Sequence, residues 1–310
     1  MNAFKKPTVL KNKLPDFFIV GGPKCGTTAL YTYLNEHPDI FMPNVKEPNY
    51  LADDLNIQRQ IRDNKGYEDL FQSARPGQMT GEGSTWYLYS QNALRHIMEM
   101  RPDARIIAMV RNPVDMAISM HAQMVYSMSE DEKDFQKSWD LQEKRKKGRS
   151  IPKFCEEPAV LYYRDICALG SQLEKLVNLV PESQRRIYLF DDFIADTKSI
   201  YEDALALLGL QSDNRQNFPP VNERKIHKAT GFAMALKSLS RTLRPAKMML
   251  RKLFPGLPSS MLKPLYDLQS EKGSLFEIPE ATREMLRTEF LPEIEAIEKI
   301  TKRDLRHWKK

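Results

Sequence analysis

Hydrophobic positions form short continuous runs that alternate with helical periodicities over the first two thirds of the chain. Residues 16–22 make an apolar, β-rich run that closes on a glycine pair, which is typical of a strand buried on both faces of a sheet. The same pattern predicts strands at 104–110 and 186–190. Helical spacing predicts helices at 29–36, 92–100, 160–180 and 197–208.

Residues at the ends of these elements support the assignments. Pro38 should end the helix that follows the first strand. Asn112 is a good N-cap, Pro113 suits the first helical position and Asp115 falls in the first turn, while Gly209 is placed to end the helix at 197–208. Strands that alternate with helices favour an α/β fold in which helices cover both faces of a parallel sheet.

The pattern changes after about residue 222, where no convincing strand is found. This part is predicted to be helical, with a periodic segment at 281–300 and a last helical turn at 305–308. Prolines at positions 245, 255, 258 and 264 should break the helices before it. With no repeat and no clear linker, we predict one domain over 1–310, made of an α/β core at 1–222 and a mainly helical, basic extension at 223–310.

Charge is unevenly distributed along the chain. There are 47 Lys and Arg against 41 Asp and Glu, which gives a net charge of +6. Residues 224–266 hold ten of the cations and no acid, so the remainder of the chain is net acidic. This basic block is the candidate surface for an anionic acceptor, and its interleaved Leu and Met residues also suit peripheral contact with a membrane.

Composition excludes several classes of protein. With 41% hydrophobic residues and no low-complexity run, the chain is predicted to be globular rather than disordered or fibrous. Cys25, Cys155 and Cys167 form no metal-binding or disulfide pattern, so we expect no zinc site and a reducing compartment. No run reaches the roughly 18 apolar residues of a membrane span, and no signal-peptide core precedes the first strand. The expected location is the cytoplasm.

The loop after the first strand carries the strongest chemical signal. Residues 21–28 read Gly-Gly-Pro-Lys-Cys-Gly-Thr-Thr, which has the GxxxxG spacing of a phosphate-binding loop and leads into a helix. Backbone amides and the helix N-terminus suit an anion, and Thr27 and Thr28 add hydroxyl donors. A simple strand-to-helix turn is the alternative interpretation of the loop alone.

Two departures distinguish this loop from that of a nucleoside triphosphatase. The lysine is Lys24 rather than the residue after the second glycine, and Arg111 stands after the second strand where a metal-holding aspartate would be expected. An anion-binding residue there indicates a nucleotide with an additional phosphate and no metal requirement. Taken alone, an arginine such as Arg111 before Asn-Pro at a strand end is usually a solvated or ion-paired residue.

Together these motifs resemble the sulfotransferase family that uses 3′-phosphoadenosine-5′-phosphosulfate (PAPS), in its carbohydrate-type and bacterial branch, including heparan sulfate sulfotransferase domains. Residues 17–30 resemble the 5′-phosphosulfate loop, and residues 110–119 resemble the 3′-phosphate motif. Further likeness lies in segments 46–51, 81–88, 163–193 and 302–308. Only about residues 225–280 are poorly covered.

The resemblance implies a P-loop fold with a helical C-terminal extension and assigns roles to individual residues. Lys24, Cys25, Gly26, Thr27 and Thr28 would hold the 5′-phosphosulfate, and Arg111 and Ser119 the 3′-phosphate. PAPS would be the cosubstrate and 3′-phosphoadenosine-5′-phosphate (PAP) the product.

The expected chemistry is in-line transfer of the sulfuryl group to a hydroxyl or amine of the acceptor. Glu47 matches the family's glutamate base, with Glu82 as the other candidate, and Lys24 would stabilise charge on the bridging oxygen. His121 is expected to pack or to line the site. Relatives have a histidine or aromatic residue where this chain has Asn49, and some have a lysine where it has Gly83.

Other functions remain open at this stage. A P-loop kinase of small molecules would need magnesium, and a noncatalytic protein could bind membranes or polyanions through the basic block. The acceptor is expected to be a carbohydrate or glycolipid, nucleic acid is not expected, and the sequence leaves the oligomeric state open.

Overall fold

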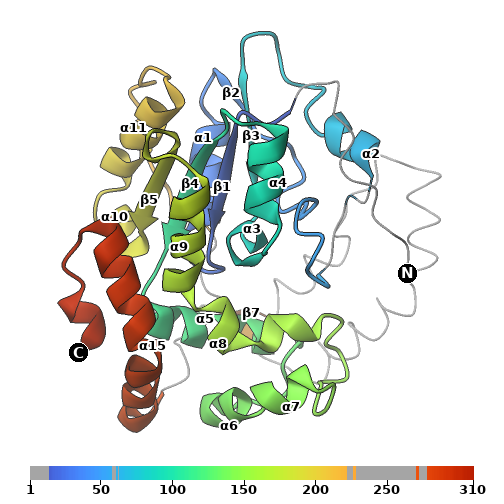
Figure 1. Cartoon of the computed structure of the whole chain (residues 1–310), viewed down its shortest axis with the longest axis vertical. Coiled ribbons are helices and arrows are strands. Elements are labelled where there is room, and N and C mark those ends of the chain that lie inside the picture. Colours follow the sequence, from blue (N-terminus) through green and yellow to red (C-terminus); the bar gives the residue numbers. More distant parts are fainter. Residues whose placement is uncertain (1–13, 58–60, 62, 222–225, 228–269, 272–277) are drawn as a thin grey trace.

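The structure is a computed structural model that describes residues 14–57, 61, 63–221, 226–227, 270–271 and 278–310. At its centre is a five-stranded sheet in the order β2-β3-β1-β4-β5, in which every neighbouring pair is parallel (Figure 1). The strands are β1 (Phe17–Gly21), β2 (Ile40–Phe41), β3 (Met79–Gly83), β4 (Arg105–Val110) and β5 (Arg185–Leu189). The predicted α/β fold with a parallel sheet is confirmed.

Helices cover both faces of this sheet (Figure 1). One layer holds α3 (Trp86–Tyr89), α4 (Ala93–Met100) and α9 (Leu169–Leu179), which contact one another, and the other holds α1 (Thr27–Asn35) and α11 (Thr197–Leu208). Beyond these layers lie α5 (Pro113–Tyr126) and α15 (Glu280–Thr301). The shorter helices are α2 (Asn64–Asp69), α6 (Phe135–Asp140), α7 (Gln142–Lys146), α8 (Tyr163–Ile166) and α10 (Phe190–Ala195). Single turns of 3₁₀ helix lie at Pro158–Leu161, Glu182–Gln184 and Arg306–Lys309.

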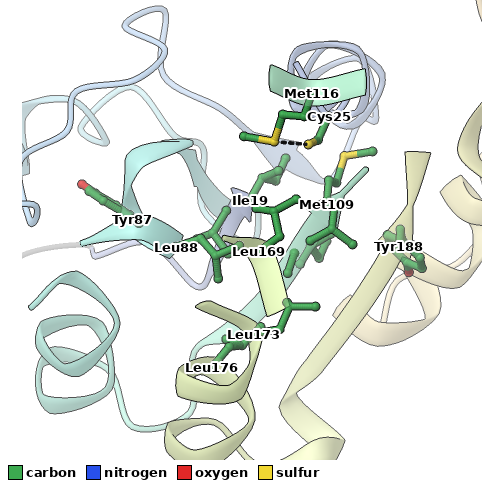
Figure 2. Close-up of a cluster of buried hydrophobic side chains, with 14 of the residues drawn as sticks. Ile19, Cys25, Tyr87, Leu88, Met109, Met116, Leu169, Leu173, Leu176 and Tyr188 are labelled. Atoms are coloured by element: carbon green, nitrogen blue, oxygen red, sulfur yellow. Dashed lines mark hydrogen bonds between the residues drawn. The ribbon is translucent and has the colours of Figure 1, made fainter. Parts of the chain in front are cut away.

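The core lies between the central strands and their helices. All five residues of β1 are buried, as are residues 106–110 of β4. Figure 2 shows side chains of these strands, such as Ile19, directed toward Leu173 and its neighbours on α9. Strands buried on both faces need apolar residues at every position, which explains the continuous hydrophobic runs in the sequence.

Several predicted helix boundaries are confirmed. The side chain of Asn112 accepts a hydrogen bond from the amide of Val114 (3.0 Å), and Pro113 is the first residue of α5. Gly209 caps α11 in the left-handed conformation, with φ of 74°. These signals are local to the chain, which is why they could be read without knowledge of the tertiary structure.

The single helix predicted at 160–180 is wrong, because the segment is broken into a 3₁₀ turn, α8 and α9. At the break, the side-chain amide of Gln172 donates to the carbonyl groups of Asp165 and Ile166, at 3.2 and 3.0 Å. Gln172 is buried, so one side chain satisfies carbonyls that would otherwise be costly to bury. The amphipathic periodicity continued through the break and concealed it.

The strands were incompletely predicted. β2 and β3 were not assigned from the sequence, because β2 has only two residues and β3 contains two glycines and a glutamate. After residue 222 no strand was expected, but β6 (Ile226–His227) and β7 (Ser270–Glu271) form an antiparallel pair. The proline-broken helices predicted before residue 265 lie outside the described residues.

The closing helix α15 packs against α9. A Cβ atom built at Gly170 would lie 2.5 Å from the carbonyl oxygen of Glu293, so only glycine permits this close helix approach. Leu286, Phe290 and Ile294 of α15 belong to the same buried cluster as the sheet. Within the described part of the chain, no helix combines the length and the apolar character needed to cross a membrane.

Candidate active site

Three segments that carry the candidate residues meet at the carboxyl edge of the sheet. Residues 21–28 follow β1, Arg111 follows β4, and Glu47 is attached to the end of β3. From β1 the chain crosses to β2 on one side, whereas from β4 it crosses to β5 on the other. In open parallel sheets, ligands bind at such a reversal of strand order.

The loop after β1 has a backbone that accommodates an anion. At Gly21 φ is 143°, and a Cβ there would lie 2.2 Å from the carbonyl oxygen of Met109. Lys24 and Gly26 also have positive φ, of 67° and 86°, and Gly26 is the N-cap of α1. The first amides of α1, at Thr27 and Thr28, precede the first helical hydrogen bond and have no partner within the helix. They and the positive end of the helix dipole are therefore available to an anion.

Arg111 lies against this loop. Its Nη1 donates to the carbonyl oxygen of Lys24 at 3.4 Å, and its guanidinium lies 4.9 Å from the ring centroid of Phe190. The same ring packs on the loop, because a Cβ at Gly26 would lie 3.0 Å from its Cδ2. Phe190 thus contacts both predicted anion-binding segments. Sequence reasoning missed it, since Phe190 was assigned to the end of a strand, but it begins α10.

Cys25 points from the loop toward α5. Its thiol is completely buried and donates to the sulfur of Met116 on α5, at 3.8 Å (Figure 2). Burial raises the pKa of the thiol to about 12, although Arg111 and Lys24 lower it slightly. The backbone amide of Cys25 already donates to the carbonyl of Gly22, at 3.3 Å. Cys25 therefore anchors the loop to α5.

The other loop and helix candidates lie close by. Thr27 is buried and Thr28 is partly exposed, both in the first turn of α1. Ser119 is buried on α5, three residues after Met116, so the two share a helix face. Because Met116 contacts Cys25, that face of α5 is directed toward the loop.

Glu47 is held beside the end of β3. Its amide donates to the carbonyl of Gly83 at 2.9 Å, and its carboxylate accepts from Lys46 Nζ at 2.6 Å and from the Thr85 hydroxyl at 3.4 Å. The side chain is 37% exposed, so an incoming group can reach the carboxylate. With φ of 57°, Glu47 has a backbone conformation that is costly for a non-glycine residue.

Glu82, the other candidate base, is enclosed. Its side chain accepts hydrogen bonds from Tyr67 (2.5 Å), Ser84 (2.6 Å) and Tyr87 (3.1 Å), and none of it is exposed. Burial raises its pKa to about 7, against the three hydroxyl donors, which lower it. Since three protein hydroxyls surround its oxygens, Glu82 cannot contact an acceptor in this arrangement.

Two further sequence features have structural explanations. His121 is completely buried, with Nε2 at 2.9 Å from the carbonyl oxygen of Glu132 and edge contacts to Phe135 and Tyr163, so it packs in the core. At Gly83, a Cβ would lie 2.7 Å from the ring of Tyr31. The Tyr31 ring therefore occupies the space that a side chain at position 83 would need, including the lysine expected there in some relatives.

Tyr67 and Tyr87 were also missed by sequence reasoning. They lie on α2 and α3, no chemical role could be assigned to either tyrosine from the sequence, and only the fold brings them to Glu82. Across the described ranges, no group of three or more His, Cys, Asp or Glu side chains is arranged to hold a metal ion.

Comparisons with known proteins find sulfotransferases. Residues 14–157 match the family model of the sulfotransferase domain. Mouse heparan sulfate glucosamine 3-O-sulfotransferase 6 is 37% identical over 113 residues, which are 36% of this chain and 31% of that protein. Mouse carbohydrate sulfotransferase 15 is 29% identical over 147 residues, covering 33% of this chain and 26% of the relative. The chain thus spans about a third or less of the length of these curated relatives.

A solved structure extends the likeness to most of the chain. A sulfotransferase from Alicyclobacillus acidocaldarius superposes with a TM-score of 0.71 at 25% identity, covering 96% of this chain and all of that one. The predicted resemblance is confirmed. The loops after β1 and β4 and the Glu47 segment all lie within residues 14–157, the part of this chain that matches the sulfotransferase domain model.

Proposed function

We propose that this protein is a PAPS-dependent sulfotransferase that transfers the sulfuryl group to a hydroxyl or amine of a carbohydrate or glycolipid. The observation that carries the proposal is the contact between Arg111 and the carbonyl of Lys24, at the point where the strand order reverses. This contact joins the two segments that we propose bind the phosphates, at the edge where parallel sheets bind ligands. The sulfotransferase domain over residues 14–157 supports the same activity.

The residues present fit a nucleotide with phosphates at the 5′ and 3′ positions of its ribose. The loop around Gly26 and the first turn of α1 would hold the 5′-phosphosulfate, with Lys24 beside it. Arg111 and Ser119 would hold the 3′-phosphate. Bound PAPS supplies an activated sulfuryl group, which these residues orient. We assign no metal to the reaction, because the cations of the chain can neutralise both phosphates.

Glu47 is the proposed base. The acceptor oxygen forms a bond to sulfur, the bond from sulfur to the 5′-phosphate oxygen breaks, and the acceptor proton passes to Glu47. Its 37% exposure and its hydrogen bonds to Lys46 and Thr85 favour this role over the enclosed Glu82. Lys24 would stabilise charge on the departing phosphate, which matters most in the transition state.

Carbohydrate acceptors are proposed from the names of the relatives, which act on heparan sulfate and other carbohydrates. The basic block at 224–266 remains the proposed surface for an anionic acceptor or membrane, but it lies largely outside the described residues. We also propose a cytoplasmic location, since Cys25, Cys155 and Cys167 are free thiols.

The direct test is incubation of the purified chain with sulfur-labelled PAPS and a panel of carbohydrates and glycolipids, followed by mass analysis. We expect one acceptor class to gain a sulfuryl group and PAP to form in equal amount. Transfer of phosphate from magnesium ATP, with no product from PAPS, would overturn the proposal.

A Glu47→Gln variant tests the assigned base. Its turnover should fall by about 10² to 10⁴-fold while PAPS binding stays within about twofold of wild type. Glu99→Gln is the control, because Glu99 is an exposed carboxylate near a cation, Arg95, on α4. Unchanged turnover in Glu47→Gln would assign the base to another group.

A further inference from the structure

The segment that carries Glu47 has an unfavourable backbone that needs external support. Glu47 and Asn49 both have positive φ, 57° and 53°, although neither is glycine. Such conformations persist only where surrounding contacts impose them, and they concentrate at functional sites. The contacts that hold residues 47–51 are therefore part of the machinery that places the Glu47 carboxylate.

Three residues of this segment are held by three different side chains. The amide of Asn49 donates to the hydroxyl of Ser84 (3.2 Å), and the amide of Leu51 donates to the hydroxyl of Tyr87 (3.1 Å). Between them, the ring of Tyr50 stacks on Tyr67, with 4.4 Å between centroids and 20° between planes. These three supports come from the end of β3, from α3 and from α2.

All three supports end on the same carboxylate. Ser84 donates to Oε1 of Glu82, and Tyr67 and Tyr87 donate to Oε2. An ionised carboxylate only accepts hydrogen bonds, so it fixes the proton of each hydroxyl toward itself. The lone pairs of Ser84 and Tyr87 are then directed to the amides of Asn49 and Leu51.

We infer that Glu82 is a positioning residue, whose ionised carboxylate orders residues 47–51 through three hydroxyl groups and so sets the place of Glu47. The expected effect on turnover rests on the proposed function. The ordering of residues 47–51 does not, because it requires no ligand. Glu82 thus acts through other residues and takes no proton from the acceptor.

Protonation of Glu82 should loosen the segment. A neutral carboxyl must donate one hydrogen bond, and any of its three partners that accepts it must redirect its own proton. The titratable groups that face Glu82 are Tyr67, Tyr87 and, from α1, Tyr31, and burial raises the pKa of all three. They stay neutral near pH 7, whereas the pKa of Glu82 is raised to about 7.

Hydrogen exchange without any ligand tests the ordering. In Glu82→Gln, Ser84→Ala and Tyr87→Phe we expect the amides of residues 49–51 to exchange about tenfold faster than in wild type, with β1 and β4 unchanged. Tyr163→Phe is the matched control, because it removes a tyrosine hydroxyl from another buried carboxylate, Glu130, and leaves the Arg145 pair of that carboxylate intact. Exchange at 49–51 that stays at the wild-type rate in all three site variants would overturn the inference.

The pH dependence of turnover tests the consequence. Wild-type kcat should fall as the pH decreases through about 7, at unchanged KM for PAPS. Glu82→Gln should have kcat about tenfold lower and lack this fall. A variant that keeps the wild-type profile would contradict the positioning role. If exchange responds as expected but no sulfated product forms with PAPS, the ordering stands and the proposed function fails.

Discussion

Two buried carboxylates in this protein have similar hydrogen-bond partners, but their pKa values are shifted in opposite directions. Glu82 and Glu130 each accept hydrogen bonds from serine and tyrosine, and neither side chain is exposed. Glu130 is also paired with Arg145, at 2.7 Å from both of its oxygens. Among the described residues, no cation forms a salt bridge with Glu82.

The pKa values follow from this difference. Burial would raise the pKa of Glu130, but Arg145, Ser138 and a backbone amide outweigh it, and the net shift is downward. At Glu82, burial outweighs the hydroxyls and the pKa rises to about 7. A bidentate arginine thus favours the charged form of one carboxylate, while the carboxylate next to the Glu47 segment is left able to titrate near neutral pH.

The largest expected effect comes from removing the buried cation. Arg145→Met leaves Glu130 buried without its countercharge and should lower the free energy of unfolding by about 3–5 kcal/mol at pH 7. Urea unfolding measures this. The cost should shrink at acid pH, because Glu130 can then become neutral, and a Glu130→Gln/Arg145→Met double variant should recover part of it. A loss below about 1 kcal/mol would show that the pair is not desolvated.

Glu82 should have the opposite influence on stability. Because its folded pKa is raised, its stabilising contribution is complete below pH 4.5 and is lost as the pH rises through about 7. The shift from 4.5 to about 7 corresponds to about 3 kcal/mol. Relative to Glu82→Gln, wild type should therefore lose up to this amount between pH 4.5 and 8, as followed by urea unfolding.

That result would show that stability and turnover depend on pH in opposite directions. We expect wild type to gain turnover over the same pH range in which Glu82 costs it stability. A difference between the two proteins that is constant with pH would mean that Glu82 is ionised throughout, as Glu130 is.

The smallest effect is expected from single tyrosine hydroxyls. Tyr163→Phe removes a 3.1 Å donor to Glu130, and Tyr67→Phe a 2.5 Å donor to Glu82. Each should cost about 1–2 kcal/mol in thermal or urea unfolding. Only Tyr67→Phe should also lower kcat, since the ring that stacks on Tyr50 then loses its hydrogen bond to Glu82 and is less firmly placed. Equal kcat values in the two variants would remove the functional distinction between the carboxylates.

Much of the fold could be predicted because its signals are local. The β1 and β4 runs are apolar at nearly every position, and caps such as Asn112 and Gly209 act within one turn. β3 was missed since its sequence favours no strand. Its Gly81 is required by the ring of Phe17, which would lie 2.2 Å from a Cβ there.

The candidate site also has a part that could be predicted from local sequence and a part that could not. Lys24 and Arg111 follow directly after strands, so their meeting at one edge of the sheet could be predicted. The support of Glu47 could not, because Tyr67, Glu82 and Tyr87 come from three elements and only tertiary packing joins them. Phe190 shows the same limit, as its contact with Arg111 depends on where β5 ends.

Calorimetric titration of PAP and AMP tests the central claim, that Lys24 and Arg111 form two anion sites at the reversal of strand order. The two nucleotides differ only in the 3′-phosphate assigned to Arg111. Wild type should bind PAP about 10- to 100-fold more tightly than AMP. Arg111→Ala should reduce this preference to about twofold, and Arg95→Ala, a surface cation on α4, should leave it intact. A preference for PAP that survives in Arg111→Ala would contradict the account.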